Sequence, residues 1–466
     1  MSPIPGPLIL LALPLAAAVV AYLVRRWAGL AAFVSMATSG VLAILCLRLP
    51  LDRSAFVLAQ EVAFGRPVVL VGRNLVLDPA GQVWLAFVFG LATIFFLLAW
   101  CLPQGRAFFA FGLVILTLYA LIALLETFSL AVLVFAMSAT PAIFMIQAPH
   151  RVSVRGAQRY LLVTVLAVPL LLAASWMADQ SLLDPERIEL ARQALLPAGL
   201  GFALLLAVFP FVTWMPALAG DAPPLATAFV FTAGQAMAVY LVMMFLHATP
   251  WYLGIPTASD VLLFVGLVMV ISGGIMAAVQ NDFGRVLGYA ALSDLGYFLL
   301  AFGVGGSQGA VLALLHLVNR SLVITLMAAA LAVLRQQAST DVFSRLRGLA
   351  RKLPIAMMAL MIGGLALAGF PFTAGFPTHW AVSRYLAADH WEWVLLLLAS
   401  SLGIAIGLLR GLSSALGTAP ADAKIRQPVV SSIMVLALTA AVIVLGLYPQ
   451  LFLGPVSSAV KALALF

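Results

Sequence analysis

About 14 apolar stretches of roughly 20 residues recur along this chain and leave little choice of fold. A helix of that length crosses a hydrocarbon core of about 30 Å, because each residue adds about 1.5 Å. Hydrophobic residues make up 64% of the 466 positions and charged residues 9%, so the chain cannot present a water-soluble surface. We therefore predict an all-α polytopic membrane protein.

The expected spans are residues 6–24, 28–48, 78–101, 107–125, 127–148, 158–178, 197–216, 223–246, 258–279, 285–305, 308–334, 355–387, 392–413 and 429–454. The first stretch lacks a basic segment and a cleavage site, so we expect a retained span rather than a signal peptide.

Two of the expected spans, the seventh and the twelfth, contain almost the same interruption. The runs are Leu206-Ala-Val-Phe-Pro-Phe211 and Leu367-Ala-Gly-Phe-Pro-Phe372. Proline removes a backbone hydrogen bond from a helix, and paired interruptions are typical of transporters built from two related halves. We therefore expect helices seven and twelve to be broken, with the breaks marked by four prolines: Pro210, Pro216, Pro371 and Pro377.

The paired breaks predict two inverted five-helix repeats, residues 107–247 and 258–413, with helices four to eight and nine to thirteen. Residues 1–106 would form helices one to three with an external loop. Alternating apolar residues between Gly and Pro make residues 50–77 a candidate hairpin in that loop. Residues 414–466 would carry helix fourteen. The mixed segment 184–194 suits a short helix on the membrane surface.

Lys and Arg are concentrated in the loops that follow odd-numbered spans, which carry about twice as many as the loops on the other side. The odd loops are therefore expected in the cytoplasm, and both termini outside, in a prokaryotic inner membrane. This asymmetry accounts for the net charge of +8. A nucleic-acid partner is therefore not expected.

Several motifs follow one another in an order that resembles one family. They are Pro-Phe-Val-Thr-Trp-Met-Pro at 210–216, Ala-Pro-Pro at 222–224, Gln280-Asn-Asp282 with Arg285, Leu292-Ser-Asp-Leu-Gly296, Leu315-His-Leu-Val-Asn319, and Gly369 to Trp380. The chain resembles the proton-conducting, antiporter-like membrane subunits of respiratory complex I, group 4 membrane hydrogenases and multisubunit cation/proton antiporters. The resemblance extends from the fourth span to the thirteenth.

This resemblance implies a subunit of an ion-translocating complex of the NADH:quinone oxidoreductase or hydrogenase type. Its partners would be the other membrane subunits of that complex, the lipid bilayer and, if it conducts, protons. It would bind no redox cofactor and would not be catalytic alone. The alternative is a stand-alone secondary transporter, or the membrane partner of an inorganic-carbon uptake system, with the same fold.

The intramembrane ionisable residues of that family are mostly absent at the matching positions. Ala136 stands at the position of a glutamate, and Leu205, Ala236 and Ile324 stand at positions of lysines. A fourth lysine position is occupied by His379. Losing these groups together indicates that the proton route has been changed or abolished, because charged groups persist in lipid only where they have a function.

Four ionisable residues remain inside the expected spans or at a break, namely His316, Arg320, Asp294 and His379. An unpartnered arginine in lipid is unfavourable, so Asp294 and Arg320 are expected to form a buried ion pair between spans ten and eleven. The pair could be a fixed clamp or a gate. His379 could handle protons, since imidazole titrates near neutrality, or could be a hydrogen-bonded residue near the membrane face. With Gln235, these are the candidate proton-path or gating residues.

Other polar residues have simpler interpretations. Glu126 is expected in a loop, and Asp221 and Asp260 are expected to cap helix N-termini. The five histidines are scattered in the sequence, so no metal site is predicted. The sequence thus favours a degenerate scaffold that has lost proton translocation. A subunit that still conducts through His316, His379 and the Asp294–Arg320 pair is the competing mechanism.

Overall fold

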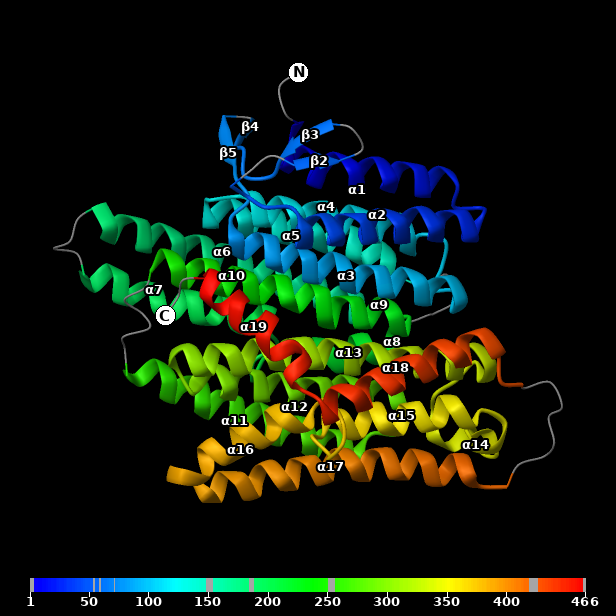
Figure 1. Ribbon diagram of the computed structural model, residues 1–466. Coiled ribbons are helices and arrows are strands. Elements are labelled where there is room, and N and C mark those ends of the chain that lie inside the picture. The colour runs from blue at the N-terminus through cyan, green and yellow to red at the C-terminus, as the bar shows by residue number, and fades with distance from the viewer. Residues whose placement is uncertain are drawn as a thin grey trace.

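The computed structural model describes residues 4–52, 55–57, 60–70, 72–147, 154–183, 188–249, 256–418 and 426–463. In this part of the chain almost every element is a helix, as predicted (Figure 1). The helices lie side by side, with the N-terminal part at the top of the view and the C-terminal part below it. Helix α19 crosses the front between the two parts.

The helices of the N-terminal part are α1 Gly6–Leu23, α2 Ala28–Arg48, α3 Pro79–Cys101, α4 Phe108–Leu124, α5 Phe128–Ile146, α6 Arg155–Leu183, α7 Ile188–Leu205, α8 Trp214–Asp221, α9 Pro224–Phe229, the π-helical turn η2 Val230–Gly234 and α10 Gln235–Ala248. Those of the C-terminal part are α11 Pro256–Val279, α12 Phe283–Gly303, α13 Gly306–Ala338, η4 Phe343–Arg345, α14 Leu349–Lys352, α15 Pro354–Leu367, α16 Phe376–Asp389, α17 Trp391–Leu416, α18 Val429–Leu447 and α19 Gln450–Leu463.

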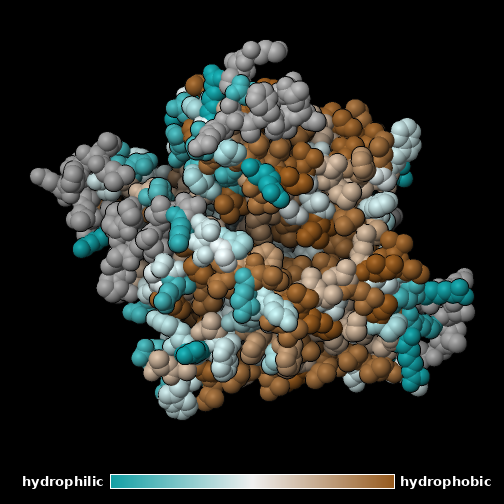
Figure 2. All heavy atoms as spheres, in the orientation of Figure 1, coloured by the Kyte–Doolittle hydropathy of each residue, from teal (hydrophilic) through white to brown (hydrophobic). Residues whose placement is uncertain are grey.

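Eleven of the described helical segments are long and apolar enough to cross a membrane. Figure 2 shows the matching surface, with apolar residues across the middle and hydrophilic residues gathered toward both ends of the helices. In the long helices α12 and α13, 89% of the apolar 18-residue stretch is buried inside the protein, whereas in α1 and α17 the buried share is 39%. Helices α12 and α13 therefore form the centre of the bundle, and α1 and α17 lie at its periphery.

The external loop contains short strands, including the hairpin predicted within residues 50–77. Strands β4 Val68–Leu70 and β5 Arg73–Leu75 pair antiparallel. Strand β3 Gln60–Ala63 pairs antiparallel with β2 Ala55–Val57 and parallel with β1 Ile4–Pro5.

Both expected interruptions are present as breaks of equal length, residues 206–213 between α7 and α8 and residues 368–375 between α15 and α16. We call them the first break and the second break. Each break begins with the same kind of turn. One residue, Ala207 in the first break or Gly369 in the second, has a positive φ angle. The backbone amide of the next residue donates a hydrogen bond to the carbonyl five residues earlier in the chain. Helices α7 and α15 therefore end with the same backbone conformation. The run of Leu, Phe and Pro that the two breaks share predicts this conformation only in part.

The role expected for two of the prolines was wrong. Pro210 and Pro371 lie inside the breaks, whereas Pro216 and Pro377 lie in the first turns of α8 and α16. Proline is tolerated there because the first amides of a helix have no intrahelical partner. Pro216 and Pro377 therefore begin the second half of each broken helix.

Several boundaries also differ from the sequence expectation. The fourteenth span ends at Leu447, and α19 follows as a separate helix. Of the segment 184–194 expected on the membrane surface, residues 184–187 lie outside the described residues. Residues 188–194 are continuous with the seventh span, because α7 runs without interruption from Ile188 to Leu205. Asp221 does not cap the half-helix that follows the first break, but it accepts a hydrogen bond at the N-terminus of α6, and Asp260 is not at a helix N-terminus. Asp221 is the last residue of α8 and its Oδ2 accepts a hydrogen bond from the amide of Gly156, while Asp260 lies inside α11. Glu126 lies between α4 and α5, as predicted.

Candidate functional site

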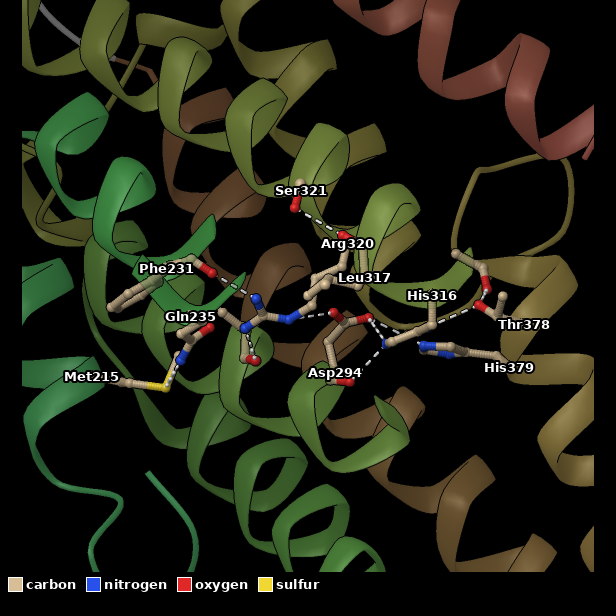
Figure 3. Close-up of polar contacts among 12 residues, drawn as sticks. Met215, Phe231, Gln235, Asp294, His316, Leu317, Arg320, Ser321, Thr378 and His379 are labelled. Atoms are coloured by element: carbon tan, nitrogen blue, oxygen red, sulfur yellow. Dashed lines mark hydrogen bonds and ion pairs between the residues drawn. The ribbon is translucent and has the colours of Figure 1, made fainter. Parts of the chain in front are cut away.

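The four ionisable residues expected inside the membrane meet at one place in the centre of the bundle (Figure 3). Asp294 lies near the middle of α12. His316 and Arg320 are one turn apart on α13 and therefore lie on the same helix face. His379 lies in the first turn of α16, directly after the second break. All four are at most 4% exposed.

Asp294 and Arg320 form the predicted buried ion pair. The Nε atom of Arg320 lies 3.1 Å from Oδ2 of Asp294, and the two side chains are 0% and 2% exposed. The N–H direction does not meet hydrogen-bond geometry, so the contact is an ion pair rather than a directed hydrogen bond. The charge of each partner is compensated by the other, as burial in the centre of a membrane protein requires.

The other two nitrogens of Arg320 bind backbone carbonyls, one in the N-terminal part of the molecule and one in α12. Nη1 donates to the carbonyl of Phe231 at 2.6 Å, and Nη2 donates to the carbonyl of Ala291 at 3.0 Å. Phe231 lies in the π-helical turn η2, where the wider turn disturbs the usual backbone pairing. Arg320 therefore joins the carboxylate on α12 to the irregular turn between α9 and α10.

His379 contacts the other carboxylate oxygen and is held by a ring stack. Its Nε2 lies 3.2 Å from Oδ1 of Asp294, and its ring stacks on Tyr297 with the centroids 3.6 Å apart. Nδ1 is buried and has no hydrogen-bond partner in the described residues. This atom lies against Gly369 in the second break, where a Cβ would come within 2.1 Å of it. His379 is therefore buried within the bundle and hydrogen-bonded through Nε2.

Both ring nitrogens of His316 have partners, and these partners restrict its protons. Nε2 lies 2.8 Å from the backbone carbonyl of Asp294, which can only accept, so this nitrogen carries a hydrogen. Nδ1 lies 2.9 Å from Oγ1 of Thr378, whose hydroxyl is also 3.1 Å from the carbonyl of Gly375. If the hydroxyl hydrogen points to Gly375, Nδ1 must donate and His316 is charged. If it points to Nδ1, His316 is neutral. Rotation of one hydroxyl thus accompanies a change of charge.

The expectation that the histidines are scattered was wrong in three dimensions. One ligand atom each from Asp294, His316 and His379 lies within 4.8 Å of the others, and these residue types can bind zinc. However, Nε2 of His316 is bonded to a carbonyl, and the Arg320 guanidinium already compensates the carboxylate. A divalent cation would lie beside this positive group in a medium of low dielectric. The cluster therefore suits protons better than a metal ion.

Gln235, the fifth candidate, is buried but does not contact the cluster directly. It begins α10, one turn after Phe231, and its Nε2 donates to Sδ of Met215 at 3.4 Å (Figure 3). Leu205 and Ala236, at positions where lysines were expected from the resemblance, are 7% and 0% exposed. Two of the lysine positions near the first break are thus occupied by buried, uncharged side chains.

A second buried guanidinium, that of Arg335, was not among the candidate residues, because Arg335 directly follows the expected span 308–334. It lies in the last turn of α13, is 8% exposed, and donates to the carbonyls of Ala219, Gly220 and Ala222 at the end of α8. It also forms a 2.7 Å ion pair with Asp341, whose Oδ2 accepts from the amide of Gly284. No motif marks this residue, because the carbonyls that it binds are backbone groups.

Comparison with known proteins identifies the family. Residues 126–407 match the model of the NADH:quinone oxidoreductase/Mrp antiporter transmembrane family. The chain belongs to this family. The matched segment contains both breaks and all four residues of the central cluster.

The family assignment is supported by similarity over greater lengths. Subunit N of the NADH-quinone oxidoreductase of Desulforudis audaxviator is 30% identical over 371 residues, which cover 74% of this chain and 73% of the relative. A chain of the Mrp complex from Dietzia sp. DQ12-45-1b has a TM-score of 0.81 at 17% identity, with 98% of this chain and 97% of that chain covered. A chain of respiratory complex I from Thermus thermophilus has a TM-score of 0.76 at 21% identity, with 98% and 99% covered. The described fold is therefore that of an antiporter-like subunit over its whole length.

Proposed function

We propose that this protein is an antiporter-like subunit of a multisubunit, energy-converting membrane complex in which the proton route is altered rather than lost. The subunit assignment is supported by family membership and by the extended match to subunit N of an NADH-quinone oxidoreductase. The altered route is supported by one observation, the buried contact of the Asp294 carboxylate with two imidazoles and one guanidinium.

In this proposal Asp294 and His379 exchange a proton within the membrane. Oδ1 of Asp294 lies 3.2 Å from Nε2 of His379, close enough for transfer along a hydrogen bond. Nδ1 of His379 faces the second break and is free to take up the next proton from that side. Arg320 stabilises the carboxylate after the proton has left, because its charge stays within 3.1 Å.

His316 and Thr378 provide the second branch of the relay. Nε2 of His316 lies 3.5 Å from Oδ1 of Asp294, and Nδ1 contacts the hydroxyl of Thr378, which reorients toward Gly375. A hydroxyl can donate and accept in turn, so Thr378 can give its proton to Nδ1 of His316 and take up another from the side of the second break. Nε2 of His316 can then release its proton to Oδ1 of Asp294 when its N–H turns away from the Asp294 carbonyl. The relay therefore needs only rotation of the hydroxyl and small displacements of the rings.

The same proposal assigns the internal organisation and the orientation. Residues 107–247 and 258–413 form two inverted repeats, residues 1–106 add three helices and the external loop, and residues 414–466 close the bundle. The equal length and similar entry turns of the two breaks support the repeats. The Lys/Arg-rich loops lie in the cytoplasm of a prokaryotic cell, and both termini lie outside. Labelling of single cysteines in whole cells with an impermeant reagent would test this orientation.

The assembly is tested by purifying the chain through an affinity tag in mild detergent from its native membrane. We expect it to elute with other membrane subunits of a redox-driven or ion-exchanging complex. A monomer that transports a substrate by itself would contradict the subunit assignment and support the stand-alone transporter.

The relay is tested with the intact complex in liposomes that contain a pH-sensitive dye. The variants Asp294→Asn and His379→Gln should lower the proton flux at least tenfold. His390→Gln is the matched control, because His390 is exposed just beyond the other end of α16. An unchanged flux in both cluster variants would support the scaffold mechanism instead.

A further inference from the structure

A small cavity of about 10 Å³ lies beside the first break. Its lining includes Leu205 from the end of α7, Trp214 from the start of α8, Tyr160 from α6, and Val230 and Gln235 from the π-helical turn and α10. The polar residues of the central cluster do not reach it. The cavity therefore lies apart from the charged cluster, and of the candidate residues only Gln235 lines it.

Two buried polar atoms on residues that line this cavity have no hydrogen-bond partner among the described residues. They are Nε1 of Trp214, which can only donate, and Oε1 of Gln235, which can only accept. Trp214 is 1% exposed and Gln235 is 2% exposed. A buried polar group without a partner destabilises the fold, because it has given up its hydrogen bonds to water. Two such groups around one cavity indicate that something small and polar occupies it.

We propose that the cavity binds a single water molecule, held between the indole of Trp214 and the side-chain amide of Gln235. A cavity must offer about 10–15 Å³ to hold one water, so there is room for one and not for a chain. The water would accept from Nε1 and donate to Oε1. If the side-chain amide of Gln235 is rotated by about 180°, its Nε2 faces the water, and the water accepts hydrogen bonds from both residues. In either orientation of the amide, Nε1 of Trp214 has a hydrogen-bond acceptor.

The surroundings of this water isolate it from bulk solvent. Leu205 and Val230 present apolar side chains, and the hydroxyl of Thr164 is already bonded to the carbonyl of Tyr160. The wall at Val230 belongs to the π-helical turn, which Arg320 holds through the Phe231 carbonyl. None of the residues that line the cavity is an acid, a lysine, an arginine or a histidine. The first break thus retains one immobilised water without an adjacent group that titrates near neutral pH, whether or not the cluster conducts.

X-ray radiolytic footprinting of the full chain, in its intact complex, tests the site. Irradiation converts bound water into hydroxyl radicals that oxidise the nearest side chains. Trp214 lines the cavity, and Met215 contacts Gln235 through its sulfur. The matched references are Trp84, which is buried with Nε1 bonded to the Ala236 carbonyl, and Met269, which is as deeply buried as Met215. We expect Trp214 and Met215 to be oxidised at least fivefold faster than their references.

Bulk hydrogen peroxide, applied without irradiation, distinguishes a sequestered water from an open channel. Met215 should react as slowly as Met269, because peroxide must enter from solvent. In Gln235→Leu, the radiolytic rate of Trp214 should fall to that of Trp84. Equal radiolytic rates for the two tryptophans of the wild type would show that the cavity is dry and overturn the proposal. Rapid peroxide oxidation of Met215 would overturn it as well, because the water would then belong to a channel. Both of these comparisons use the wild type and stand even if the variant fails to fold.

Discussion

Removing one partner of the Asp294–Arg320 pair should destabilise the fold more than removing both. In Asp294→Ala, Arg320 stays buried with two carbonyl acceptors but no counterion. Breaking a buried pair from one side costs about 3–5 kcal/mol. In Arg320→Leu, the carboxylate keeps both histidines, so the loss should be smaller.

The double variant Asp294→Ala/Arg320→Leu contains no unpaired charge. Its main cost is the Phe231 carbonyl, which loses its 2.6 Å donor, at about 1–3 kcal/mol for a buried group. The double variant should therefore be about 2 kcal/mol more stable than Asp294→Ala, or roughly 30-fold in the folding equilibrium. The measurement is SDS-induced unfolding in mixed micelles, followed by circular dichroism.

A matched cycle at the membrane surface provides the control. Asp282 and Arg285 form a 3.7 Å pair in which the arginine side chain is 55% exposed. Such pairs contribute at most about 1 kcal/mol, so Asp282→Ala and Arg285→Leu should be nearly additive. Additive effects at Asp294 and Arg320 too would refute the reasoning, since they would mean that the buried charges do not compensate each other.

Three further predictions concern the frame around the cluster. Gly369→Ala should lower the proton flux as far as His379→Gln does, because the added Cβ would collide with Nδ1 of His379. Gly199→Ala is the control and should leave the flux unchanged, because the space around Gly199 is open. Thr378→Val should slow proton transfer several-fold in the same liposome assay and Thr378→Ser should restore it, because only the hydroxyl contacts His316; equal rates for the two would exclude the hydroxyl from the relay. Arg335→Leu should lower the unfolding free energy by about 3–5 kcal/mol in the SDS titration, since Asp341 loses its 2.7 Å partner, and the value should drop less when Asp341→Asn is added.

The fold was largely predictable because apolar length and proline placement act locally. Twenty apolar residues are long enough for a membrane helix wherever they occur. Pro210 and Pro371 lie in breaks as predicted, but Pro141 and Pro169 lie inside continuous helices, so a proline alone does not specify a break. The conformation of each break was less accessible. Pro371 lies one residue closer to the preceding helix end than Pro210 does, so aligning the two runs by their prolines displaces the turns by one position.

The contacts of the candidate site were predictable only where a charged residue falls within an apolar span, because burying an unpaired charge is unfavourable. Asp294 and Arg320 were paired because a lone charge in lipid is unfavourable. His316 and His379 gave no such signal, since the direction in which a helix resumes after a break depends on packing that one sequence does not reveal. Contacts between a side chain and a backbone carbonyl cannot be read from residue types, because every residue has a carbonyl. The contacts of Arg335 with α8 and of Arg320 with the Phe231 carbonyl are therefore not visible in the sequence.

The long helix α13 holds the N-terminal part of the molecule at two points. Arg320 binds the carbonyl of Phe231, and Arg335 binds the carbonyls at the end of α8. The two anchors are fifteen residues apart, or about 22 Å along the helix. Many transporters alternate access by rocking one bundle against another. In this protein such a movement would have to break the hydrogen bonds of two buried guanidinium groups to their backbone acceptors. Any ion movement therefore has to occur within a rigid frame, by rotation of side chains and hydroxyls.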